Sequence, residues 1–344
     1  MERVPLAPSR RIRLSDQQAA ETWPVGGPSR EHSVCESRRP IVRQRLSRPS
    51  PAREHLRRWF DPRGWLRTLE RAGSHHLSRT IYPHIPGLAL PYSRTLEKHL
   101  TLSEATIGLK GLPPEFDGLR MLVVSDIHAG PFVSPEALDR TIARLVELRP
   151  DVIVLPGDLL TARIEEWDVH RRAFERLRAP LGTFAVMGNH DHYTGEIDRV
   201  IERVEQAGIR VLDNASCTLQ HRGATLSLAG VDDLLMGAPD LDAALAGTEE
   251  PVILVSHNPD LLFDAARRGV ALMLSGHTHA GQIRLPGLPV LVRQSRYRLD
   301  EGRFTVGETQ AIVSRGLGAV GVPLRLHCHP EALWLTLSQS APGR

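Results

Sequence analysis

The strongest constraint on this chain is an apolar run that leads directly into a cluster of polar, ligand-type side chains. Residues 183–187 read Thr-Phe-Ala-Val-Met, and Gly188-Asn189-His190-Asp191 follows at once. A short apolar run of this kind is typical of a buried strand. Strands that deliver polar side chains at their carboxyl ends predict a binding site along one edge of an α/β sheet. Four further apolar runs end in the same way, at residues 121–125, 152–155, 252–256 and 271–275.

The side chains at these five strand ends are of the kinds that bind metal ions. Burying so many polar groups without partners would cost on the order of several kcal/mol each. Imidazole together with carboxylate and amide oxygen suits Mn, Fe, Zn, Co or Ni. The set is too large for one tetrahedral ion and suits two divalent transition-metal ions about 3.5–4 Å apart that share a carboxylate. The candidate metal ligands are Asp126, His128, Asp158, Asn189, His257, His277 and His279.

The order of the elements predicts an α/β fold in one domain over residues 100–340. Ser134 and Pro135 suit the N-cap and first position of a helix, and apolar residues at helical spacing follow them. Strand patterns alternate with these helical patterns, which is typical of α/β proteins. The other helical patterns cover residues 165–178, 197–204 and 259–268.

The first 99 residues differ from this domain in charge and composition. Residues 1–95 contain 18 Arg, no Lys and 8 acidic residues, a net charge of +10, whereas the remainder carries −7. We expect residues 1–55 to be a disordered basic arm, because they are rich in Pro, Ser and Arg. We expect residues 56–99 to be an amphipathic basic segment with a Pro-rich linker, extended over residues 81–92. The basic and aromatic residues 53–71 would suit an anionic membrane surface, or equally a helix packed on the domain with its arginines in water.

The sequence predicts neither a membrane-spanning helix nor an export signal. No run approaches the ~20 apolar residues that a span requires. The Arg10-Arg11 pair is followed by polar residues rather than by the apolar region of a signal peptide. We therefore expect a cytoplasmic protein, with peripheral contact to the inner face of the membrane as the alternative. The aromatic residues of the arm cluster within residues 59–65 and form no stacking platform for nucleic acid, and no pattern specifies an oligomeric state.

The five motifs together resemble the pattern of the calcineurin-like metallophosphoesterase superfamily. That pattern is D-x-H, G-D, G-N-H-[DE], a single His and G-H-x-H, and the chain has each in this order between residues 119 and 337. Residues 256–260 and 314–318 look most like the bacterial branch related to the YkuE and YaeI phosphoesterases. The resemblance implies a metallophosphoesterase-type α/β/β/α sandwich of two mixed sheets flanked by helices.

The resemblance also implies two ligand sets that share one carboxylate, and two catalytic residues. His190 would act as general acid or electrostatic aid to the leaving oxygen, and Asp191 would orient a histidine. One ion would be held by Asp126, His128, Asp158 and His279. The other would be held by Asp158, Asn189, His257 and His277.

Three further residues are candidates for substrate binding. Asp232 and Asp233 follow a strand pattern, and Arg315 follows another. The alternative is that they form loop turns and a salt bridge.

The sequence thus predicts a metal-dependent phosphohydrolase for phosphomonoesters or phosphodiesters, in which a metal-bridging hydroxide attacks phosphorus. One alternative is a pyrophosphatase for a lipid-linked diphosphate, such as a UDP-2,3-diacylglucosamine-type substrate, which the basic segment would suit. An alternative of another class is a metal-binding scaffold without turnover. Such a scaffold should have lost ligands, and here every ligand position is filled. Other hydrolase and nucleotide-binding motifs, namely G-x-S-x-G, H-E-x-x-H and the P-loop, do not occur in the sequence.

Overall fold

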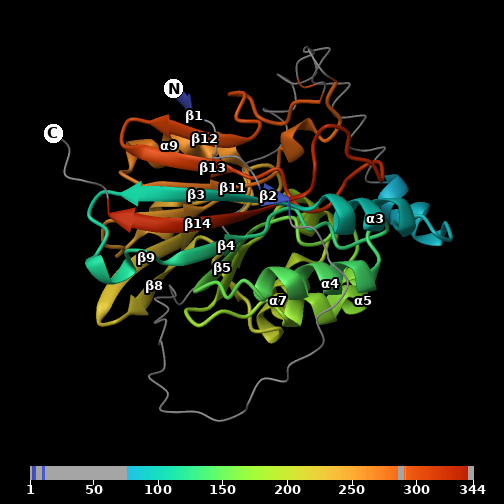
Figure 1. Cartoon of the computed structure of the whole chain (residues 1–344), viewed down its shortest axis with the longest axis horizontal. Coiled ribbons are helices and arrows are strands. Elements are labelled where there is room, and N and C mark those ends of the chain that lie inside the picture. The colour runs from blue at the N-terminus through green and yellow to red at the C-terminus, as the bar shows by residue number, and fades with distance from the viewer. Residues whose placement is uncertain (1, 5–9, 12–75, 286–289, 291, 340–344) are drawn as a thin grey trace, which may run out of the picture.

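The chain folds into two mixed β-sheets that pack face to face, with helices on both outer faces (Figure 1). A computed structural model describes residues 2–4, 10–11, 76–285, 290 and 292–339. Within these residues each sheet has seven strands. The α/β/β/α sandwich that the sequence predicted is therefore confirmed.

The N-terminal half of the domain builds most of one sheet. Strands β4, β5, β6 and β7 are parallel, with β7 at one edge, and β14 joins β4 antiparallel. In spatial order the strands are β2 (Arg10–Arg11), β3 (Thr101–Leu109), β14 (Glu331–Gln339), β4 (Arg120–Val123), β5 (Val152–Pro156), β6 (Thr183–Val186) and β7 (Arg210–Val211).

The C-terminal half builds the other sheet. Its strands β9, β10, β11 and β13 are parallel, with antiparallel strands at both sides. In spatial order the strands are β1 (Glu2–Val4), β12 (Gly302–Val306), β13 (Thr309–Val313), β11 (Leu272–Ser275), β10 (Val252–Val255), β9 (Ala224–Gly230) and β8 (Ala215–His221).

Two groups of helices complete the four layers. One group covers the first sheet: α3 (Ala89–His99), α4 (Pro135–Val146), α5 (Glu165–Glu175) and α7 (Ile197–Gln206). The other lies on the second sheet: α8 (Leu241–Leu245) and α9 (Leu262–Arg267). Short connecting helices are α6 (Asn189–Tyr193), η1 (Tyr82–His84), η2 (Pro114–Phe116), η3 (Pro259–Leu261) and η4 (His279–Gly281).

Alternating side chains of the strands fill separate core layers. In β5, Val152 and Val154 point between the sheets, whereas Ile153 points to the helices. In β10, Ile253 faces the interior of the sandwich and Leu254 packs towards α9. Both faces of these strands are buried, which explains why they are continuous apolar runs in the sequence.

The N-terminal region differs from expectation at two places that the structure describes. Residues 2–4 and 10–11 lie in the segment expected to be disordered, yet they pair with β12 and β3 at the sheet edges. The expectation of an extended linker over residues 81–92 is wrong, because η1 and the first turns of α3 lie there. The fully buried Tyr92 holds α3 to the domain by donating to the carbonyl oxygen of Leu317 (2.6 Å).

Other N-terminal predictions stay predictions. Nearly all of the arm over residues 1–55, and the amphipathic segment up to residue 75, lie outside the described residues. The boundary at residue 100 likewise stays a prediction about which part of the chain folds alone. Among the helices that the structure describes, none is both long and apolar enough to cross a bilayer.

Candidate metal centre

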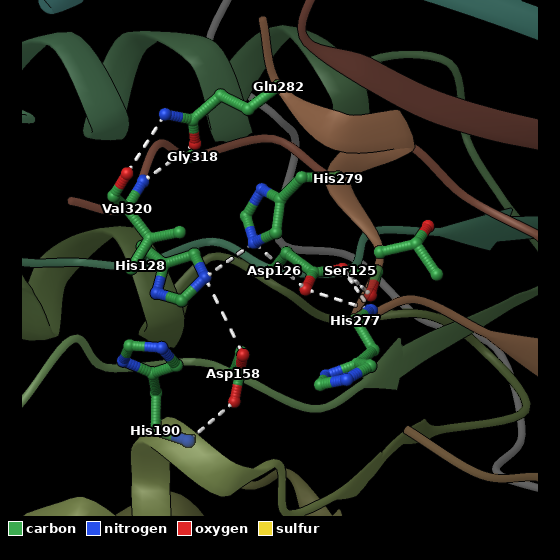
Figure 2. A network of polar contacts seen from close by, with 12 residues as sticks. Ser125, Asp126, His128, Asp158, His190, His277, His279, Gln282, Gly318 and Val320 are labelled. Carbon is green, nitrogen blue, oxygen red and sulfur yellow. Dashed lines mark hydrogen bonds and ion pairs between the residues drawn. The ribbon is translucent and has the colours of Figure 1, made fainter. Parts of the chain in front are cut away.

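Five loops bring the predicted residues together where the two sheets end. Three loops follow β4, β5 and β6 in one sheet, and two follow β10 and β11 in the other. The carboxyl ends of parallel strands meet at one edge, so side chains far apart in sequence converge there. Figure 2 shows Asp126, His128, Asp158, His277 and His279 pointing towards one another.

The backbone turns sharply at the same positions. Asp126, His128, Asp158, His277 and His279 all have φ angles between 44° and 72°. Residues with a Cβ rarely adopt this left-handed region. Such strain costs on the order of 1–3 kcal/mol per residue and persists where surrounding contacts fix it, as at functional sites.

The first group of side chains surrounds a single point. The Nε2 atoms of His128 and His279 lie 3.0 Å apart. His128 Nε2 is 3.6 Å from Asp158 Oδ2, and His279 Nε2 is 3.4 Å from Asp126 Oδ1. All four side chains are buried, and their possible ligand atoms lie within 4.8 Å of one another. This spacing suits one metal ion.

The second group shares Asp158 with the first. Asp158 Oδ2 is 3.2 Å from His257 Nε2, which in turn is 3.2 Å from His277 Nδ1. Asn189 is a buried residue at the start of α6. Its Oδ1 has no hydrogen-bond partner among the described residues. An orphaned buried amide oxygen is costly unless something binds it. The donor set therefore fits a candidate dimetal site bridged by Asp158.

Backbone groups hold these side chains in place. The Pro156 carbonyl oxygen lies 2.8 Å from His257 Nδ1, so it can accept a hydrogen bond from the Nδ1–H group. This leaves Nε2 as the nitrogen that can bind an ion. The His277 N–H donates to Asp126 Oδ1 (3.0 Å), and the His190 N–H donates to Asp158 Oδ1 (2.8 Å). These contacts fix the orientation of both carboxylates.

The charges of the cluster depend on each other. Burial would raise the pKa of Asp158, but the imidazoles of His257, His190 and His128 outweigh burial and hold it well below its usual range. Burial would lower the pKa of His257, yet Asp158 and Asp126 raise it to about 10. Without metal, His257 is therefore protonated at neutral pH, and a metal must displace that proton to bind.

The other histidine pair is neutral. Burial, reinforced by His190, lowers the pKa of His128 well below its usual range. Burial, reinforced by His128 and Arg325, does the same for the pKa of His279. Neutral imidazole is the form that binds metal, so these two residues are ready to act as ligands.

Glycines of the motifs allow the loops to approach closely. A Cβ on Gly276 would overlap Ser125 Oγ and Asp126 Oδ2. A Cβ on Gly188 would overlap the Asp158 carboxylate. At both positions a side chain would displace a carboxylate of the candidate site.

His190 lies beside the cluster rather than within it. Its Nδ1 is 2.6 Å from the Thr161 carbonyl oxygen, and its ring packs edge-on against His128 with centroids 4.7 Å apart. The buried carboxylate of Glu166 accepts from the N–H of Thr161 (2.8 Å) and also holds the two following residues. The Thr161 carbonyl thus fixes the His190 ring and leaves Nε2 available.

Asp191 acts on the backbone rather than on a histidine. Its carboxylate accepts from the N–H groups of Gly188 (2.9 Å), Leu160 (2.9 Å) and Leu159 (3.3 Å). The expectation that it orients a histidine is wrong, because its side chain joins the loops after β5 and β6 instead.

The three candidate substrate residues make the contacts expected of loop turns and a salt bridge, which was the alternative to substrate binding. Asp232 accepts from His192 Nε2 (2.7 Å), and Asp233 Oδ2 accepts from two N–H groups of its own loop. The Arg315 guanidinium pairs with Glu331 (2.8 Å). These are turn contacts and a salt bridge, and substrate binding by these residues stays a prediction.

The structure also reveals a residue that the sequence did not indicate. Arg325 is 6% exposed, and its Nη2 lies 2.9 Å from His279 Nδ1. Its Nε donates to the Gly318 carbonyl oxygen (2.7 Å). A single arginine between two leucines gives no periodic signal, so only the tertiary structure shows its place behind a candidate ligand.

Comparisons with known proteins identify the family of the region that contains this candidate site. Residues 119–281 match the family profile described as calcineurin-like phosphoesterase. The metallophosphoesterase YkuE of Bacillus subtilis is 34% identical over 258 residues, which cover 72% of this chain and 90% of that protein. The phosphodiesterase YaeI of Escherichia coli is 34% identical over 231 residues, which cover 63% of this chain and 82% of that protein. The chain belongs to the calcineurin-like phosphoesterase family, and its likeness to YkuE and YaeI confirms the bacterial branch expected from the motifs.

A longer relative shares the same region. A Danio rerio transmembrane protein with a metallophosphoesterase domain is 33% identical over 255 residues, 69% of this chain. The chain spans 57% of that protein's length.

Proposed function

We propose that this protein is a phosphoester hydrolase that works with two divalent transition-metal ions. The observation that supports this most strongly is the shared carboxylate of Asp158, which stands between two groups of buried side chains with metal-ligand spacing. Asp126, His128 and His279 would complete one site. Asn189, His257 and His277 would complete the other.

Two bound ions would supply Lewis acidity and a nucleophile derived from water, as in other two-metal sites that displace a group at phosphorus. The protein's own part is to fix the geometry. The left-handed backbone at five ligand positions and the buried hydrogen bonds to Asp126 and Asp158 hold the ligands before an ion arrives.

His190 is the proposed proton donor to the leaving oxygen. With Nδ1 held by the Thr161 carbonyl oxygen, a protonated imidazole can donate only from Nε2. The ring lies against His128, so this proton donor would lie beside the two metal ions without being one of their ligands. A positioned acid of this kind typically contributes about 10²–10⁴-fold to the rate.

The test is an activity panel with metal-reconstituted protein. It should include p-nitrophenyl phosphate, its bis ester, nucleotides and a lipid-linked diphosphate, each with Mn, Zn, Fe, Co or Ni. We expect hydrolysis of at least one ester, complete loss in chelator and recovery on adding metal. Preferred cleavage of the diphosphate would favour the pyrophosphatase alternative. Stoichiometric metal binding with no turnover on any member would favour the scaffold alternative.

A further inference from the structure

Large exposed apolar side chains gather at one end of the molecule. Twelve such residues are 36–60% exposed in the described part of the chain, and all but Val169 lie at the end where the site strands stop. Val169 lies on α5. In Figure 1 this is the end occupied by α3 and by the loops that precede β12 and β14. The described turns at the opposite end, such as residues 222–223 and 307–308, contribute none of them.

Three of the segments at this end contact each other directly. Tyr82 Oη donates to the Gly321 carbonyl oxygen (2.9 Å), which joins η1 to the loop before β14. The Arg284 N–H donates to the Leu326 carbonyl oxygen (2.9 Å), which joins that loop to the segment after η4. Together these joined segments carry six exposed aliphatic side chains, here called the docking surface: Ile81, Ile85, Leu285, Val322, Leu324 and Leu326, each 37–49% exposed.

The docking surface is the outer side of a segment that supports the metal centre. Leu324 and Leu326 point outward with 49% and 37% exposure, whereas Arg325 between them is 6% exposed and reaches His279. Only the segment that carries Arg325 therefore separates the docking surface from a candidate metal ligand.

The same segments carry positive charge and no acidic residue. Residues 76–96, 282–299 and 315–330 contain no Asp or Glu. Some of their arginines pair with acids elsewhere, as Arg284 does with Glu301. Among the described residues, no ion pair is formed by the exposed guanidinium groups of Arg94, Arg296 and Arg298, whereas Arg79 interacts electrostatically with Glu165.

We propose that the docking surface binds an anionic lipid bilayer. Aliphatic side chains on several loops, accompanied by unpaired arginines, suit the boundary between headgroups and acyl chains. Exposed apolar side chains that gather on neighbouring segments mark an interaction site. A second copy of the chain would bring like-charged arginines together across a two-fold axis, which opposes self-association through this face. The six side chains of the patch are aliphatic and offer no stacking platform for nucleic acid.

The experiment is co-sedimentation of the full chain with phosphatidylglycerol or phosphatidylcholine vesicles at low and high salt, in chelator. Working without metal makes binding independent of the proposed hydrolysis, so either can fail alone. We expect binding to phosphatidylglycerol vesicles that weakens with salt. Ile85→Glu with Leu324→Glu should reduce the partition coefficient by at least ~10-fold, because two inserted side chains are lost and two negative charges are added.

Val169→Glu is the matched control, since it places the same charge on an exposed apolar position of another face. It should bind as the wild type does. If thermal melting shows that the double glutamate variant is unfolded, Ile85→Ser with Leu324→Ser replaces it, with a smaller loss expected. A wild type that does not sediment with phosphatidylglycerol vesicles would overturn the proposal. So would a folded double variant that binds normally, or one whose only change is the dissociation of a wild-type dimer.

Discussion

Replacing His190 with alanine should separate metal binding from catalysis. The backbone N–H of His190 holds Asp158 Oδ1, and alanine keeps that hydrogen bond. The imidazole itself contacts the Thr161 carbonyl oxygen and the face of His128, not a carboxylate of the candidate centre. The variant should therefore bind metal nearly as well as the wild type.

The rate should fall because the proton donor is lost. A positioned acid contributes about 10²–10⁴-fold, which corresponds to about 3–5 kcal/mol of activation free energy at about 1.36 kcal/mol per tenfold change. A leaving group that is stable as an anion needs little protonation. The loss in kcat should thus be largest for alkyl and phenyl esters and smallest for p-nitrophenyl esters.

The assay is kcat for a series of aryl and alkyl phosphate esters, with the metal content of each preparation measured in parallel. His192→Ala is the matched control, because His192 lies on the same short helix but pairs with Asp232 Oδ1. It should leave the dependence on leaving group unchanged. Equal loss for good and poor leaving groups, in a His190 variant with full metal content, would refute the role of His190 as acid.

Two further substitutions test the supports of the site. Gly276→Ala should lower the unfolding free energy by more than ~2 kcal/mol and weaken metal binding, because the added Cβ would overlap Ser125 and Asp126. Gly118→Ala is the control, since a Cβ there meets no atom within 4 Å. In denaturant unfolding it should show only the strain of its positive φ, about 1 kcal/mol. Burial raises the pKa of Glu166 from 4.5 to about 7. The folded state then keeps a proton that the unfolded state has lost, so stability falls by up to about 3 kcal/mol as pH rises from about 4.5 to 7. The raised pKa values of Asp126 (about 6) and Asp191 (about 7) act in the same direction over this range. Glu166→Gln should therefore reduce, but not abolish, the fall of stability with pH in chemical denaturation, and an unchanged slope would contradict the assignment.

The strands that lead to the candidate site could be predicted because each is an apolar run followed directly by polar residues of metal-ligand type. Strands buried on both faces are continuous apolar runs, and each is followed by its polar residues within a few positions. Six of the seven residues that the sequence grouped as metal ligands converge in the structure as two clusters that share Asp158. Asn189 lies at the start of α6, where the orphaned amide oxygen supports its place in the set.

The N-terminal helix was missed for a local reason. Three prolines suggested an extended linker, but Pro91 lies in the first turn of α3, where a missing N–H costs little. The spacing of Tyr92 and Leu96, four residues apart and both fully buried, was the signal of a helix face.

The roles of Asp191 and Arg325 could not be read from sequence. Asp191 looks like a histidine partner in its motif, but the loop after β5 offers it N–H groups that only the folded arrangement brings near. Arg325 is buried because it meets His279, 46 residues away in the chain. Contacts of this kind depend on loop conformation rather than on periodicity.

The most direct test of the two-ion account is elemental analysis of the active, metal-replete protein alongside Asp158→Asn. Because Asp158 stands between both groups of candidate ligands, the wild type should bind two transition ions per chain, and the variant should lose affinity at both positions together with hydrolysis. A wild type that is fully active with one ion or none per chain would contradict the shared-carboxylate centre.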